Sequence, residues 1–209
     1  MSVLVISDPG GTHDGQLDRM YRLIDAAAAA GANVMKFQFT SSPERLAERR
    51  HAPEYVEAYQ KLAFPRDWLP HLAARCENRD VEFACTVYLA SDLPVIAPFV
   101  KRFKIASFEA RDSEFLRAHG SYAAREARPG LIVSTGAMDA DEVDALDRVC
   151  SRLWAYYALL HCVSAYPAPP EDMNLWLLGK GEGERRAEYS GLSDHSCSPI
   201  VAAMAVARG

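Results

Sequence analysis

The chain has 209 residues, of which 49% are hydrophobic and 24% are charged, and its formal net charge at pH 7 is −5. This composition is typical of a globular protein with a sizeable core, and the acidic balance with scattered arginines argues against nucleic acid as a partner. No apolar run reaches the roughly 18 to 20 residues that cross a bilayer, and no signal-type segment opens the chain. We therefore expect a cytoplasmic protein that makes no membrane contact.

Short apolar runs rich in β-branched and aromatic residues alternate with longer helical patterns along the chain. This alternation is typical of repeated βα units and a parallel sheet. Seven strands are expected, at residues 3–7, 34–39, 81–88, 102–107, 130–136, 156–162 and 188–195.

The segments between the strands contain helix signals. Apolar residues recur at spacings of three and four over 17–28, and Gly31 is a plausible stop. Asp139 and Glu142 are spaced as a capping box at the start of another helix. The stretch 179–186, "GKGEGERR", is expected to be a solvated loop, because it lacks the Ser/Thr of a phosphate-binding loop.

Seven parallel strands with crossover helices fit either an open doubly wound sheet or most of a (β/α)8 barrel. Polar residues lie at or just after the carboxyl ends of most strands. A barrel brings all of these ends to one mouth, whereas a doubly wound sheet gathers only those near its switch point. We therefore favour a single α/β domain over 1–209, of the (β/α)8 TIM-barrel type with about seven βα units. The polar residues at strand ends are Lys36, Gln38, Thr86, Lys104, Ser107, Glu109, Ser134, Thr135, His161 and Ser193 to His195.

Two lysines in these apolar strands suggest an anion site. Lys36 and Gln38 are two apart, so they project to the same side of a strand, and Lys104 repeats the arrangement later in the chain. Burying an unpaired ammonium costs on the order of several kcal/mol. A carboxylate or an anionic ligand is therefore expected to pair with these lysines. The alternative is an exposed strand end. Hydroxyls that add donors for a phosphate, or that simply cap helices and turns, are Thr86, Ser107 and Ser134.

Two histidines, His161 and His195, end the sixth and seventh expected strands. Paired imidazoles with oxygen ligands suit a divalent first-row metal, although each histidine could also be a satisfied core or turn residue. His13 follows the first strand among glycines and either approaches a ligand or hydrogen-bonds its own turn. The remaining histidines are expected at the surface: His51, His71 and His119.

The five cysteines show no CxxC pair and no regular spacing, so neither a disulfide framework nor a thiolate zinc site is expected. They are interpreted as reduced thiols, mostly small buried residues: Cys76, Cys85, Cys150, Cys162 and Cys197.

Taken together, several runs resemble the N-acetylneuraminate (sialic acid) synthase family, and they occur in the family's order. These runs are "SDPGGTHDG", "KFQF", "CTVY", "FKIASFEA", "STGAM", "LLHCVSAYPAPPEDMNL" and "YSGLSDHS". The resemblance implies a (β/α)8 barrel that condenses phosphoenolpyruvate with an N-acylated amino sugar, giving a nonulosonic (2-keto) acid and phosphate. It also implies a divalent metal, usually Mn²⁺ with Mg²⁺ or Co²⁺ as alternatives, held by His161 and His195, and a possible homodimer.

The resemblance also assigns roles within the site. Gln38 and Glu109 are implied to lie close to the reacting groups, with Glu109 as the carboxylate that assists addition of water. Asp8 stands where the family has a glutamate that faces the sugar, and Tyr166 is implied to contact substrate. The residues implied to line the phosphoenolpyruvate site are Lys36, Lys104, Thr86, Ser107 and Ser134.

The chain departs from the family at its end, because it stops before an eighth strand and before the C-terminal antifreeze-like domain. It is therefore expected to be truncated relative to the family. An active synthase is the first interpretation. The alternatives are a catalytically degenerate barrel that binds a phosphorylated ligand or a partner, and a related metal-dependent aldolase or lyase acting on another sugar acid.

Overall fold

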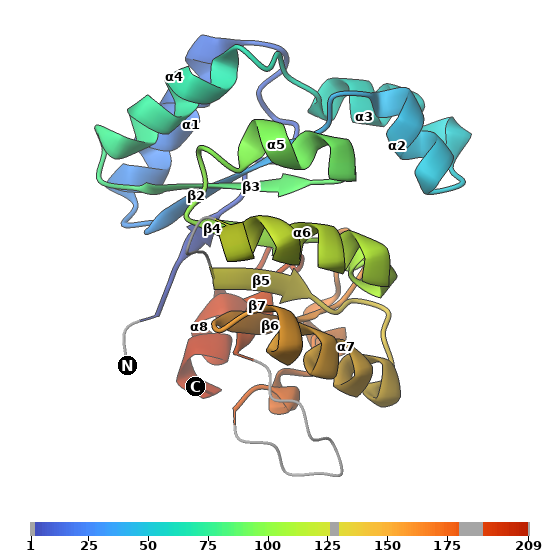
Figure 1. Cartoon of the computed structure of the whole chain (residues 1–209). Helices are drawn as coiled ribbons and strands as arrows, with labels where there is room; N and C mark the ends of the chain where they lie inside the picture. Colours follow the sequence, from blue (N-terminus) through green and yellow to red (C-terminus); the bar gives the residue numbers. More distant parts are fainter. Residues whose placement is uncertain (1–2, 126–129, 180–189, 209) are drawn as a thin grey trace. The chain divides into compact units, whose positions relative to one another are not determined.

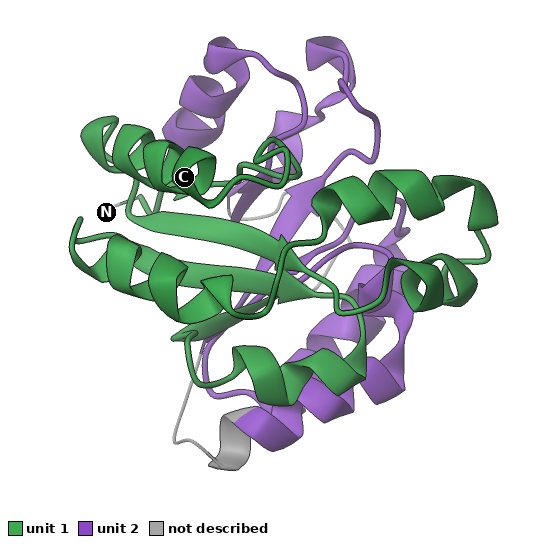
Figure 2. Cartoon of the chain, turned by 90° about the horizontal axis from the view of Figure 1, so that it is seen from above, with its two compact units in different colours: residues 1–104 green, residues 105–209 purple. Residues whose placement is uncertain are grey.

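A computed structural model of the chain describes residues 3–125, 130–179 and 190–208. The chain divides into two compact units, unit 1 over Met1–Lys104 and unit 2 over Ile105–Gly209 (Figure 2). Strands and helices alternate along the chain in both units (Figure 1), as the sequence predicts.

Unit 1 contains four parallel strands that pair in chain order. They are β1 (Ile6–Ser7), β2 (Val34–Phe39), β3 (Glu82–Val87) and β4 (Arg102–Ile105), the last of which has its final residue, Ile105, in unit 2. The helices of this unit are α1 (Leu17–Ala29), α2 (Pro43–Arg49), α3 (Val56–Leu62), α4 (Trp68–Glu77) and α5 (Leu93–Ile96), with short 3-10 turns η1 (Pro53–Tyr55) and η2 (Ala90–Asp92).

Unit 2 continues the pattern with three strands, again parallel and paired in chain order. They are β5 (Gly130–Ser134), β6 (Tyr157–Cys162) and β7 (Gly191–Ser193). The helices are α6 (Ser113–Arg125), α7 (Ala140–Leu153) and α8 (Pro199–Arg208), with 3-10 turns η3 (Glu109–Arg111), η4 (Pro170–Asp172) and η5 (Leu175–Leu177).

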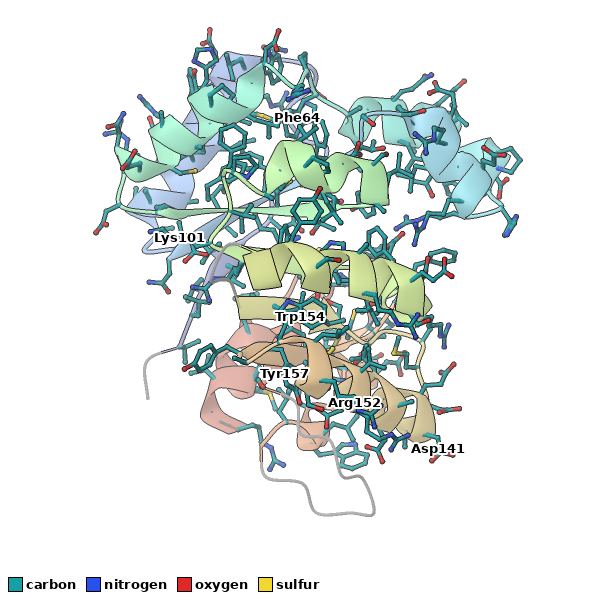
Figure 3. All side chains as sticks on the ribbon, viewed as in Figure 1. Phe64, Lys101, Asp141, Arg152, Trp154 and Tyr157 are labelled. Carbon is teal, nitrogen blue, oxygen red and sulfur yellow. The ribbon has the colours of Figure 1, made fainter. Side chains whose placement is uncertain are left out.

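An aromatic cluster fixes which side of β2 faces the helices of unit 1. Phe37 and Phe39 are 0% and 2% exposed, and both rings pack against Phe64, with ring centroids 6.3 and 5.4 Å away. Phe37 also stacks on Phe83 of β3, with ring centroids 5.5 Å apart. Figure 3 labels Phe64, the residue on which the two phenylalanines of β2 converge. Because side chains alternate along a strand, Lys36 and Gln38 lie on the opposite side of β2.

The first strand is shorter than the sequence predicts. Only Ile6 and Ser7 pair with β2, whereas residues 3–5 are exposed hydrophobics outside the strand. Just before β1, the backbone N–H of Val5 donates to the side-chain Oδ1 of Asn33 at 2.8 Å instead of to a backbone carbonyl of β2. Each of the other six expected runs contains a strand, and most of the predicted loop 179–186 lies outside the described residues.

Local helix signals are confirmed. The helix predicted over 17–28 is α1, and Gly31 follows it with φ +82°, a left-handed conformation that suits glycine. Asp139 caps α7 by accepting from Glu142 N at 2.9 Å, and Glu142 accepts in return from Asp139 N at 3.0 Å. This reciprocal pair is the predicted capping box.

The histidines expected at the surface behave differently from one another. His51 and His71 are exposed, as predicted. The prediction for His119 is wrong, because this residue is completely buried in α6. Its Nδ1 lies 2.9 Å from Phe115 O, and its ring packs edge-on against Phe115 at 4.5 Å. Positions four apart share a helix face, so His119 follows Phe115 into the core.

The cysteine prediction is confirmed in the described chain. All five cysteines are free thiols, and four of them are buried, whereas Cys197 is exposed. Burial raises the pKa of the Cys76 and Cys150 thiols to about 12.

Among the described residues, no helix has the length and apolar character needed to cross a membrane.

The capping box generates a stability prediction. Replacing Asp139 with Ala removes the side-chain acceptor at the start of α7, and we expect the free energy of unfolding to fall by about 1 kcal/mol. Urea denaturation followed by circular dichroism measures this change. Asp141→Ala is the matched control, because Asp141 lies in the same first turn but outside the box, and its loss should cost only about 0.3 kcal/mol. Equal effects of the two substitutions would contradict the capping role.

Candidate active site

The predicted site residues of unit 1 lie in two adjacent rows on the side of the sheet away from the aromatic cluster. In the strand register, Gln38 pairs with Thr86, and Thr86 pairs with Lys104. Residues paired across parallel strands project to the same side, so these three side chains form one row. Lys36 precedes Gln38 by two positions and lies on the same side, beside Asp8. We call these five residues the unit 1 cluster.

The Asp8 carboxylate is held by groups that favour its ionised form. Lys36 Nζ forms an ion pair with Asp8 Oδ2, and Gln38 Nε2 donates to Oδ1 and Oδ2 at 3.1 and 3.2 Å. Gly10 N also donates to Oδ1, at 3.0 Å. Burial by itself would raise the pKa of Asp8, but the charge of Lys36 and these hydrogen bonds outweigh it, so the pKa is lowered.

Thr86 and Lys104 are buried polar residues. Lys104 is 6% exposed and Thr86 is 2% exposed. The Thr86 Oγ1 atom is buried and has no hydrogen-bond partner among the described residues. A buried hydroxyl without a partner costs about 1 to 3 kcal/mol of stability, so this position is poorly explained by folding alone.

Tyr88, which is not among the predicted site residues, extends the unit 1 cluster. Tyr88 is 5% exposed and donates its phenolic O–H to Gln38 Oε1. It follows Thr86 by two positions and therefore projects to the same side. The same period-two spacing that identified Lys36 and Gln38 could have identified it.

Unit 2 contains a second group of residues, which we call the unit 2 cluster. Three of its members are predicted site residues, Ser107, Ser134 and His195, and two are not, Gly136 and Cys162. Gly136 N donates to Ser107 Oγ at 2.9 Å, and the Ser107 hydroxyl donates to Cys162 Sγ at 3.6 Å. Cys162 Sγ lies 3.8 Å from His195 Nδ1. Ser134 is 3% exposed and pairs with Leu160, two positions before Cys162, so it lies on the same side of the sheet.

The imidazole of His195 is fixed in orientation. Its Nδ1 donates to Val163 O at 2.8 Å, which places the lone pair of the neutral ring on Nε2. The ring of Tyr166 packs over it with centroids 4.1 Å apart, although Tyr166 itself is 78% exposed. The backbone carbonyl of His195 accepts from Ala168 N at 2.9 Å, so the loop after β6 holds this residue from two sides.

The structure places His161 on the other side of β6. His161 pairs with Leu192 of β7, and Leu192 packs with Met173 and Val201 in the helix-side core. His161 Nε2 donates to Met173 O at 2.7 Å. Cys162 pairs instead with Ser193, which puts it on the side of His195. The strand alternation therefore does not bring His161 and His195 onto one face.

Two further predicted residues have clear positions. Glu109 is completely buried at the start of η3 in unit 2. His13 is 1% exposed and satisfied within unit 1, because Gly15 N donates to its Nδ1 at 3.0 Å and its Nε2 donates to Leu62 O at 3.1 Å. For His13 the interpretation as a residue bonded within its own turn is the one that the structure favours.

The predicted metal pair does not fit this geometry. His195 presents a fixed imidazole, and a metal ligand typically donates its other ring N–H in this way. His161 lies on the helix side, and the described residues contain no group of three or more His, Cys, Asp or Glu side chains that could hold a metal ion. Metal binding through His161 and His195 together therefore stays a prediction without geometric support.

The parallel βα units and the polar strand ends define the class of the protein, an α/β protein of the (β/α)8-barrel type with seven of the units. A crystal structure of N-acetylneuraminic acid (sialic acid) synthetase from Leptospira borgpetersenii, in complex with citrate, has this fold. It matches with a TM-score of 0.85 and 29% sequence identity, and the match covers 100% of this chain and 70% of that chain.

The sequence identifies the family. The NeuB family pattern matches residues 23–209, and the chain belongs to the NeuB family. The spore coat polysaccharide biosynthesis protein SpsE of Bacillus subtilis is 32% identical over 215 residues, which cover 99% of this chain and 57% of that protein. A pseudaminic acid synthase of Campylobacter jejuni is 31% identical over 231 residues, covering 99% of this chain and 62% of that protein. The chain thus spans about three fifths of these relatives' length, and the predicted resemblance to sialic acid synthases is confirmed.

The packing of the unit 2 cluster generates a prediction about Gly136. A Cβ atom at this position would lie 2.1 Å from Ser164 Oγ, 2.9 Å from Ser107 Oγ and 3.1 Å from Cys162 Sγ. We expect Gly136→Ala to lower the free energy of unfolding by about 1 to 3 kcal/mol, because these side chains have to move. Thermal denaturation measures the loss.

Gly120→Ala is the control for that experiment. A Cβ atom there meets Leu153 Cβ at an ordinary 3.4 Å, and alanine is the better helix former by about 1 kcal/mol. This substitution should leave the melting temperature unchanged or raise it. A Gly136→Ala protein as stable as the unmodified chain would show that the cluster is loosely packed.

Proposed function

We propose that this chain condenses phosphoenolpyruvate with an N-acylated amino sugar, giving a nonulosonic (2-keto) acid and inorganic phosphate. Membership of the NeuB family and similarity to a pseudaminic acid synthase support this proposal. The observation that supports it is the row of Gln38, Thr86 and Lys104 beside Lys36. This row supplies cationic and donor groups, and one of the donors, the Thr86 hydroxyl, has no hydrogen-bond partner among the described residues.

The charges of the unit 1 cluster suit a ligand with a phosphate and a carboxylate. Two lysines and one aspartate give the cluster a formal net charge of about +1 at neutral pH, by the usual ionisation of these groups. Lys104 can form a charge-assisted hydrogen bond to a phosphate oxygen, and the Thr86 hydroxyl can donate to the same group. Lys36 is paired with Asp8 in the structure, so a bound anion would share or take over this ammonium.

The proposed chemistry forms a C–C bond and replaces the C2–O bond to phosphate with a bond to the oxygen of water. C3 of phosphoenolpyruvate attacks the aldehyde carbon C1 of the sugar with the electrons of its C2–C3 double bond, and the aldehyde oxygen takes up a proton to become a hydroxyl. Water adds to C2, which the attack leaves as an oxocarbenium carbon. The C2–O bond to phosphate then breaks, and the hydroxyl of the tetrahedral intermediate gives up its proton, which leaves the 2-keto group and inorganic phosphate. The lysines hold the anionic groups in the reacting geometry, and Glu109 is proposed as the base that takes a proton from the water.

Dependence on a divalent metal, Mn²⁺ first, is a separate proposal. Within the described chain, His195 is the member of the predicted pair that lies on the side of the unit 2 cluster, so it is the ligand that we propose. Loss of activity on dialysis against a chelator, restored by Mn²⁺ in the unmodified protein but not in His195→Ala, would support it.

The central experiment measures phosphate release from phosphoenolpyruvate across a panel of N-acylated hexosamines, with Mn²⁺ present. We expect sugar-dependent release in the unmodified protein. In Lys104→Met, the KM for phosphoenolpyruvate should rise by at least about tenfold, because a charge-assisted hydrogen bond worth about 1.5 to 3 kcal/mol is lost. In Glu109→Gln, turnover should fall with little change in that KM.

Lys101→Met is the matched control for Lys104→Met. Lys101 is exposed and precedes β4 (Figure 3), so removing its charge should leave the KM unchanged. If phosphoenolpyruvate raises the melting temperature but no sugar elicits phosphate release, the protein is a binding protein rather than a synthase. Metal-dependent cleavage of a sugar acid without phosphate release would instead indicate an aldolase or lyase.

Thr86 provides a second prediction, which separates ligand binding from stability. Thr86→Val removes a hydroxyl that has no partner among the described residues, so the melting temperature should stay the same or rise. Binding of phosphoenolpyruvate, measured by calorimetry, should weaken by about tenfold because one donor is lost. The control is Thr135→Val in unit 2, where the hydroxyl donates to Leu160 O at 3.0 Å, and its loss should cost about 1 kcal/mol of stability. A clear loss of stability in Thr86→Val would contradict a ligand-binding role.

A further inference from the structure

Tyr88 stands at the end of a hydrogen-bonded chain that runs through the unit 1 cluster. Its phenol contacts Gln38 Oε1, Gln38 Nε2 contacts Asp8, and Asp8 pairs with Lys36. All four side chains are on the same side of the sheet. The Gln38 amide contacts both Tyr88 and Asp8, so it connects the phenol to the carboxylate.

Only one assignment of donors and acceptors satisfies this series of hydrogen bonds. An ionised carboxylate only accepts hydrogen bonds, so the NH2 group of Gln38 has to face Asp8, from which it lies 3.1 and 3.2 Å. The amide oxygen then faces Tyr88, and the phenol is the donor in that contact. A flipped amide would place its oxygen against the carboxylate and its NH2 against the phenol.

The ring of Tyr88 is itself held in place. The guanidinium of Arg50, at the end of α2, lies 4.8 Å from the Tyr88 ring centroid. The same guanidinium lies 5.6 Å from the ring of Tyr59 on α3. A cation over an aromatic face is attracted to it, so Arg50 connects α2 and α3 to the side chain that orients Gln38.

We propose that Tyr88 is a positioning residue for Asp8, and that its phenol locks the Gln38 amide in the orientation that donates to the Asp8 carboxylate beside Lys36. A phenylalanine at this position would keep the ring under Arg50 but would let the amide rotate. Gln38 would then donate to Asp8 for only part of the time. Tyr88 thereby sets how firmly Asp8 is ionised and how strongly it competes with an incoming anion for Lys36.

The groups around Asp8 in unit 1 determine the direction in which its pKa should change in the variant. The charge that acts on the Asp8 carboxylate is that of Lys36, which favours the ionised form. The thiol of Cys85 on β3 is buried, and burial raises its pKa, so it brings no negative charge near the pair at neutral pH. Lys104 lies in the next row. Burial opposes ionisation of Asp8, and the Lys36 charge and the Gln38 hydrogen bonds overcome it, so weakening the Gln38 bonds lets the pKa of Asp8 rise.

The experiment follows the Asp8 carboxyl carbon by NMR in protein labelled with ¹³C-aspartate, with the signal assigned from its absence in Asp8→Asn. We expect the titration midpoint in Tyr88→Phe to move to higher pH by about 0.5 to 1 unit relative to the unmodified protein. Tyr59→Phe is the control, because it also removes a phenol next to Arg50 but lies outside the chain of hydrogen bonds. An unchanged midpoint in Tyr88→Phe, or an equal shift in Tyr59→Phe, overturns the proposal.

A second variant keeps the test decisive if Tyr88→Phe does not fold. Gln38→Leu removes the amide itself, so it should raise the Asp8 midpoint by at least as much, and adding Tyr88→Phe should then cause no further shift. A midpoint unaffected by Gln38→Leu also overturns the proposal, because Tyr88 would have nothing to act through.

Only the consequence for ligand binding rests on the proposed function. The NMR titration needs no substrate, so a shifted midpoint together with no phosphate release supports the positioning role and rejects the synthase. An unshifted midpoint in a protein that releases phosphate rejects the positioning role and supports the synthase. In an active enzyme, we also expect Tyr88→Phe to move the acid limb of the pH dependence of the KM for phosphoenolpyruvate in the same direction.

Discussion

The alternation of side chains along β2 is the constraint on which the unit 1 cluster depends. Phe37 and Phe39 are almost fully buried against Phe64 on the helix side, and this packing leaves one side for Lys36 and Gln38. A slip of one residue in the strand register would exchange the aromatic and the polar side chains of β2 between the two sides of the sheet. It would place the Lys36 ammonium among aromatic rings, at a cost of about several kcal/mol. The aromatic core thus determines where the charges lie.

One group of the unit 1 cluster is unfavourable for folding. It is the buried Thr86 hydroxyl, which has no hydrogen-bond partner among the described residues. Asp8 is stabilised in the opposite sense, since its lowered pKa means that the folded protein favours the carboxylate. This stabilisation is complete above the ordinary aspartate pKa of about 3.9 and is lost as the pH falls through the lower folded value. A polar interior that folding does not require is typical of functional sites, and it agrees with membership of the NeuB family.

The same alternation has a different result in unit 2. Along β6 it sends His161 towards Met173 and the helix-side core, and it sends Cys162 towards His195. A histidine in a strand-end motif is therefore not necessarily a ligand, because one position along the strand decides which side it faces. Gly136 shows how closely the unit 2 cluster is packed, since a single methyl group there would overlap Ser164.

The sequence by itself determined the alternating units, six of the seven strands within a few residues, the capping box at Asp139 and the common side of Lys36 and Gln38. These features depend on local propensity and on a period of two, which neighbouring residues specify. Only the tertiary structure decided that Asp8 meets Lys36, that Tyr88 orients Gln38, that His119 is buried and that His161 faces away from His195. Each of these depends on register between strands or on packing between residues far apart in the chain, and no local pattern encodes such contacts.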